Sequence, residues 1–164
     1  MAKHQAEFVS ILDRQVNDTD LTIKNLPPGS YVATVQGYNL DKSSQKQTEF
    51  VEFTMKIVEA QNDVDEDALD EYLTNADGSR KKLTDCTIRS PYYLTENALP
   101  RLRIFLDHLE GNKPGDKESK AFRISYSQAI AESINKTCVI FVKHKPWQSG
   151  EGVSARVSGS AIAE

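Results

Sequence analysis

The histidines and cysteines of the chain, the side chains most often used in metal binding and nucleophilic catalysis, have no partners at a useful spacing. His4, His108 and His144 lie far apart in the sequence, and Cys86 and Cys138 do not form a CxxC pair. The chain also lacks the GxGxxG, P-loop and GxSxG patterns. We therefore expect a protein without enzyme activity, metal or cofactor.

One acidic run imitates the start of a calcium-binding loop. Asp63, Asp65 and Asp67 have the spacing of the first three ligands of an EF-hand. Ala68 stands where that loop requires glycine, and Thr74 stands where it requires a bidentate glutamate. The sequence therefore predicts a solvated acidic segment rather than a calcium site.

Charge is distributed unevenly along the chain. The formal net charge is −4, from 20 Lys and Arg against 24 Asp and Glu, which by itself disfavours a nucleic-acid partner. Residues 59–78, however, contain eight acidic residues and no Lys or Arg. The rest of the chain has 20 basic and 16 acidic residues, a net charge of +4. This pattern indicates a basic body that carries an acidic insertion.

Hydrophobic periodicity predicts five strands and one long amphipathic helix. This helix covers 96–110, with Thr95 as its N-cap and Gly111 after its C-terminus. The second strand alternates clearly, so Val51, Phe53, Met55 and Ile57 should face the core. The expected strands cover 31–38, 48–58, 83–90, 137–142 and 153–157, and shorter helices are expected within 67–74 and 127–134. The fourth strand is apolar throughout, which predicts burial on both of its faces.

This order of elements predicts a mainly β protein with helices (α+β). The expected architecture is a five-stranded OB-fold, a Greek-key barrel, with the helix 96–110 between the third and fourth strands. A β-sandwich with a helical insertion is the alternative. The expected organisation is an N-terminal arm (1–25), an OB-fold domain (26–158) with the acidic insertion at 59–78, and a short C-terminal tail (159–164).

Basic and aromatic residues concentrate where an OB-fold binds its ligand, on the second and third strands and in the loops after the first and fourth. Cations there would neutralise phosphates, and aromatic rings would stack on unpaired bases. The only tryptophan lies in a loop among lysines, proline and glycines. The candidate nucleic-acid-binding residues are Lys42, Lys46, Phe50, Lys56, Arg80, Lys81, Lys82, Arg89, Tyr92, Tyr93, Lys143, Lys145 and Trp147.

Several segments resemble a family of phage-encoded single-stranded DNA-binding proteins. They are Leu26-Pro27-Pro28-Gly29-Ser30-Tyr31, the Lys/Ser loop at 42–46, the strand ending Lys56-Ile57-Val58, the pattern Leu99-x-x-Leu102-x-x-Phe105-Leu106 and the segment 135–140. The resemblance covers residues 24–158. It implies an OB-fold protein that coats single-stranded DNA during phage replication or recombination, in the host cytoplasm. Replication or recombination proteins are the further partners it implies, and RNA stays open as an alternative ligand.

A function of another class also fits the sequence. The acidic segment 59–78 would then dock a basic partner or imitate DNA, which would make the chain a protein-interaction or regulatory module. The chain has no run of about 18 apolar residues and no apolar signal stretch at its N-terminus, so we expect no membrane association. The oligomeric state is open.

Overall fold

The computed structural model describes residues 24–118, 123–146 and 153–163. Trp147 and the N-terminal arm up to residue 23 lie outside these ranges. The described elements are, in chain order, β1 (Gly29–Lys42), β2 (Glu49–Ala60), α2 (Glu66–Leu73), a 3₁₀ turn (Leu83–Asp85), β3 (Thr87–Tyr93), α3 (Leu99–Leu109), α5 (Tyr126–Glu132), β4 (Thr137–Pro146) and β5 (Val153–Ala161). β5 therefore continues into the segment 159–164, where a tail is expected.

The five strands form one antiparallel sheet in the order β3-β2-β1-β4-β5. The protein is thus mainly β with helices, and α3 and α5 lie between β3 and β4 in the sequence, as predicted. The sheet is open, because β3 and β5 are its two edges and no ladder joins them in the described chain. The two edge strands nevertheless approach each other across a seam.

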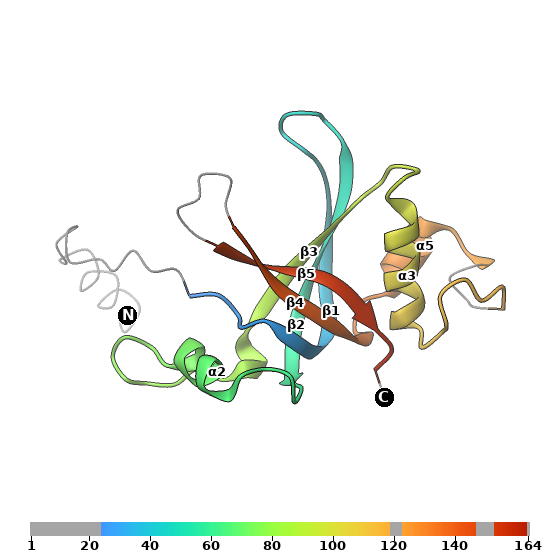
Figure 1. Ribbon diagram of the computed structural model, residues 1–164. Helices are drawn as coiled ribbons and strands as arrows, with labels where there is room; N and C mark the ends of the chain where they lie inside the picture. Colours follow the sequence, from blue (N-terminus) through green and yellow to red (C-terminus); the bar gives the residue numbers. More distant parts are fainter. Residues whose placement is uncertain (1–23, 119–122, 147–152, 164) are drawn as a thin grey trace, which may run out of the picture.

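β2 shows why the sheet has a buried and an exposed face. Val51, Phe53, Met55 and Ile57 are completely buried, which confirms the predicted alternation. β1 is longer than expected and continues to Lys42, so its end and the start of β2 form a hairpin that projects from the sheet (Figure 1). Residues 43–48 connect the two strands at the tip.

Two further strand predictions were wrong in detail. The third strand starts later than 83 and extends through Pro91 to Tyr93, because a strand at the edge of a sheet tolerates a residue without an N–H. The fourth strand continues to Pro146, so Lys143 and Lys145 lie in β4 rather than in a loop. Burial of β4 on both faces is also incomplete, because Phe141 is 37% exposed on the outer face.

α3 packs its apolar side against the inner face of the sheet. Phe105 is almost fully buried, with its ring centroid 4.9 Å from that of Phe53 and 5.0 Å from that of Tyr92. The helix begins at Leu99 rather than at 96, and Thr95 accepts a hydrogen bond from the Ala98 N–H in the turn before it. Gly111 has φ +75° directly after the C-cap, as predicted for a glycine that ends a helix.

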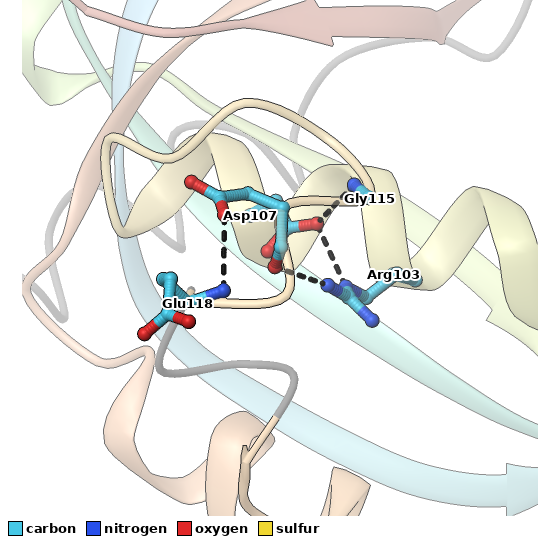
Figure 2. Close-up of polar contacts among 5 residues, drawn as sticks. Arg103, Asp107, Gly115 and Glu118 are labelled. Carbon is cyan, nitrogen blue, oxygen red and sulfur yellow. Dashed lines mark hydrogen bonds and ion pairs between the residues drawn. The ribbon is translucent and has the colours of Figure 1, made fainter.

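A buried carboxylate on α3 shapes the loop that follows (Figure 2). Asp107 has no solvent exposure, and its Oδ2 accepts hydrogen bonds from Arg103 Nε (2.7 Å) and from the Gly115 N–H (3.3 Å). Its backbone carbonyl accepts a third, from the Asn112 N–H (2.9 Å). A single side chain thus connects the helix to the loop that follows it.

The acidic segment 59–78 is anchored to the sheet. Asp65 caps α2 by accepting a hydrogen bond from the Ala68 N–H, and Val64 and Leu73 are buried. Gly29, with φ +139°, passes so close to Val64 that a Cβ on Gly29 would lie 2.6 Å from Val64 Cγ2. Asp63 accepts hydrogen bonds from the N–H and the hydroxyl of Ser30. Together with the capping Asp65, two of the three aspartates in the calcium-like run thus have hydrogen-bond partners within the protein.

We predict that Phe105→Ala lowers the free energy of unfolding by about 3–5 kcal/mol, because it removes a buried ring and leaves a cavity between α3 and the sheet. Ile104→Ala, one residue earlier and 40% exposed, is the matched control and should change stability by no more than about 0.5 kcal/mol. Urea unfolding followed by circular dichroism measures both. Equal effects of the two substitutions would contradict this packing.

The free energy of unfolding should also depend on pH through His108. Its Nδ1 lies 2.7 Å from Ser160 Oγ, and this contact links α3 to β5. Burial lowers the pKa of His108, while Asp107 acts in the opposite direction. The folded state therefore binds fewer protons than the unfolded state near and below the ordinary histidine pKa of about 6.5. The contribution of neutral His108 to the free energy of unfolding is fully present above that pH. It is lost as the pH falls from there toward the lower pKa of His108 in the folded protein.

The measurement is the free energy of unfolding at several values between about pH 5.5 and pH 7.5, for the wild type and for His108→Asn. The asparagine amide can still reach Ser160 but does not titrate. We expect the wild type to lose more stability than the variant as the pH falls. Parallel curves would show that His108 makes no such contribution.

Candidate nucleic-acid interface

The outer face of β2 and β3 carries four of the candidate residues. The register pairs Phe50 with Tyr93, Thr54 with Arg89 and Lys56 with Thr87. Directly paired residues of antiparallel strands point to the same face, so Phe50, Lys56, Arg89 and Tyr93 share one surface. The rings of Phe50 and Tyr93 touch edge to face at a centroid distance of 6.0 Å, and Tyr93 is 48% exposed. Tyr93 thus presents a supported aromatic ring to solvent.

Tyr92 points the other way, because successive side chains of a strand alternate between the two faces. Its ring stacks on Phe105 and lies edge to face with Phe53, at 5.8 Å. Burial raises the pKa of Tyr92 to about 12. Tyr92 therefore packs in the core against two other rings, and its role as a stacking platform stays a prediction. It also lines a pocket at the seam between β3 and β5.

A pocket of about 460 Å³ lies at the seam between β3 and β5. Four cations line it, and each comes from a different element: Arg89 from β3, Arg101 from α3, Lys145 from β4 and Arg156 from β5. The remaining lining residues are aromatic, aliphatic or proline: Pro91, Tyr92, Tyr93, Ala98 and Val157. We refer to it as the seam pocket.

Few counter-charges reach the seam pocket. None of its described lining residues is acidic. Arg89 has an exposed ion pair with Glu52 at 3.9 Å, and within the described chain no carboxylate pairs with Arg101, Lys145 or Arg156. An exposed pair at that distance contributes little, so all four cations remain available to an anion.

A second pocket, of about 530 Å³, lies beside the tip of the β1–β2 hairpin. Lys46 is its only described charged residue, and the others are Ser43, Ser44, Gln45, Thr48, Tyr93, Thr95 and Ala98. We refer to it as the loop pocket. Tyr93 and Ala98 line both pockets, so the two are neighbours with Tyr93 between them, and we refer to the pair as the groove.

Two of the candidate cations, Arg80 and Lys81, interact with residues of the acidic segment. The Arg80 guanidinium pairs with Asp70 of α2, and Lys81 Nζ lies 4.1 Å from the centroid of the Tyr72 ring. Asp70 and the Tyr72 ring thus hold Arg80 and Lys81 beside α2 and away from the two pockets, and their contact with a ligand stays a prediction. Lys24 joins the same side by donating to the carbonyl of Thr74.

Other candidates lie away from the groove. Lys42 lines a different pocket beside Asp41 and Glu49, and Lys143 lines one beside Asp63 and Phe141. Lys82 precedes the 3₁₀ turn, and Lys56 is exposed further along β2. Trp147 lies outside the described residues. The groove therefore gathers Lys46, Arg89, Tyr93 and Lys145 from the predicted set, with Phe50 supporting Tyr93 and the edge of Tyr92 in the seam pocket.

Arg101 and Arg156 are groove residues that the sequence did not single out. Arg101 lies in the first turn of α3, just after β3 ends, and this position was a signal available in the sequence. Arg156 lies on β5 opposite Lys143, and its approach to Arg89 depends on how the sheet curves. The hydrophobic pattern of the individual strands does not predict which edge strands of the sheet approach each other.

Other kinds of site find little support in the described residues. They contain no cluster of three or more His, Cys, Asp or Glu side chains able to hold a metal, and no helix long and apolar enough to cross a membrane. Cys86 and Cys138 are both buried, and burial raises the pKa of the Cys138 thiol to about 12. A buried and protonated thiol is a poor nucleophile.

Comparison of the chain with protein-family models and with curated proteins found no match.

Proposed function

We propose that this protein binds single-stranded DNA without strong sequence preference and without catalysis. The observation that carries the proposal is the pair of neighbouring pockets, in which Tyr93 lies between the lysine of the loop pocket and the four cations of the seam pocket. Cations that follow a phosphate backbone, interrupted by aromatic rings on which bases stack, are the general means of holding single strands.

The position of Tyr93 supports a single strand rather than a duplex as the ligand. A base can stack on a protein ring only when it has left its neighbour in a helix, as bases in single strands readily do. Phe50 holds the Tyr93 ring from the side and leaves its exposed part to solvent. Because every base has a π face, such contact tolerates any sequence.

We extend the proposal to the fold, as an OB-type barrel open at the β3–β5 seam. An OB-fold is a partly open five-stranded Greek-key barrel that binds ligands on strands 2 and 3 and in the loops after strands 1 and 4. The groove has corresponding parts, since it uses the β1–β2 loop, β3 and the facing ends of β4 and β5. The helix α3, between β3 and β4, covers the inner face.

The resemblance of residues 24–158 to phage-encoded single-stranded DNA-binding proteins supports a biological setting for the same proposal. In that setting the protein coats DNA during phage replication or recombination in the host cytoplasm, beside other replication or recombination proteins. RNA binding is tested by the same titrations with oligo-U.

We predict that Tyr93→Ala raises the Kd for oligo-dT about tenfold, because one base–ring stack contributes about 1–3 kcal/mol. Tyr126→Ala is the matched control, since Tyr126 is a similarly exposed tyrosine (38%) at the start of α5 and lines neither pocket of the groove. Fluorescence anisotropy of labelled oligo-dT at two salt concentrations measures both. Absence of binding at low salt would refute the proposed function, and equal effects of the two substitutions would refute the role of Tyr93.

We also predict that the cations of the groove and those of the acidic segment behave differently. The double substitution Arg101→Gln/Arg156→Gln should weaken binding and reduce the slope of log K against log salt by about 1.4, because two phosphate contacts are lost at ~0.7 each. Arg80→Gln/Lys81→Gln removes the same charge from the α2 side and should leave the slope unchanged. A larger effect of the second pair would place the ligand on the wrong surface for this proposal.

A further inference from the structure

The charge of the groove is concentrated at one end. The loop pocket has one described cation, Lys46, among hydroxyl and amide groups, whereas the seam pocket has four cations in a slightly smaller volume. A phosphodiester backbone carries one negative charge per nucleotide, so a path made only for a continuing strand needs cations spread along it. The excess of positive charge at the seam therefore fits a ligand group that carries more than one negative charge.

We propose that the seam pocket binds the terminal phosphomonoester of a DNA strand. This inference rests on the proposed function and specifies its substrate as a phosphorylated strand end. A phosphomonoester carries a charge of about −1.5 to −2 near pH 7 and three acceptor oxygens, compared with one charge on an internal phosphodiester. Three guanidinium groups and one ammonium around one pocket match such a dianion.

The chemistry of the lining favours phosphate over other anions. Arg89, Arg101 and Arg156 can each present two parallel N–H donors to a pair of phosphate oxygens. Lys145 adds a compact charge that can turn toward any remaining oxygen. Tyr92, Pro91 and Val157 supply the uncharged part of the wall, which reduces hydration there and strengthens each ionic contact.

The position of Tyr93 indicates how the last nucleotide would lie. Its ring borders both pockets, so a base stacked on it leaves its own phosphate within the seam pocket and directs the rest of the strand toward Lys46. The four cations come from four elements, two of which, β3 and β5, are the unpaired edges of the sheet in the described chain. Without an anion they repel one another across two unpaired strand edges, and a dianion relieves that repulsion.

The test compares three labelled oligo-dT strands of equal length, with a 5′-phosphate, a 3′-phosphate or hydroxyls at both ends, by fluorescence anisotropy near pH 7.5. We expect one phosphorylated strand to bind about tenfold more tightly than the unphosphorylated strand, the effect of one additional charge-assisted contact. The end that gains affinity identifies the polarity of the strand. The preference should shrink below about pH 6, where the dianionic phosphomonoester takes up one proton and becomes a monoanion.

Variants separate this inference from general charge attraction. Arg101→Gln/Arg156→Gln should abolish the preference for the phosphorylated end, whereas Lys46→Gln should weaken all three strands equally and preserve it. Equal binding of the three strands by the wild type would overturn the inference and leave the proposed function standing. If none of the strands binds at low salt, both proposals fail.

Discussion

The packing of Phe105 between Phe53 and Tyr92 determines where the groove residues lie. This contact seats α3 on the inner face of the sheet and so brings Arg101, one turn earlier on the helix, to the edge formed by β3. The same contact holds the Tyr92 ring inside. Strand alternation then leaves Tyr93 no orientation except outward, against Phe50. A buried aromatic cluster thus determines the geometry of a polar surface.

Local patterns in the sequence were sufficient for much of the fold. Alternation identified the buried face of β2, and the apolar stripe and Gly111 located α3 to within a few residues. The errors arose where tertiary context overrides a local signal. Pro91 suggests the end of a strand, but the edge position of β3 allows the strand to continue. Phe141 suggests burial, but its side chain is 37% exposed on the outer face of β4, although Val139 on the same face is buried.

The candidate site was less predictable, because it depends on pairs of residues distant in sequence. Arg89 and Arg156 approach only through the curvature of the whole sheet, which no local pattern encodes. Arg80 and Lys81 looked equivalent to the groove cations, yet Asp70 and Tyr72 hold them on α2. Figure 1 shows α2 well away from α3, so the acidic segment and the Arg101 side of the groove are separate surfaces of one small molecule. A role of α2 in binding a basic protein partner remains a prediction.

Pro91 has a consequence for how copies of this protein can be crowded together. A proline in a sheet is accommodated where its missing N–H faces away from the neighbouring strand, which for β3 is the side of the seam. The edge of β3 that faces the seam therefore lacks a donor within the strand, at Pro91, and is a poor template for a strand from another molecule. An interrupted edge hinders the sheets of two crowded copies from pairing into an aggregate.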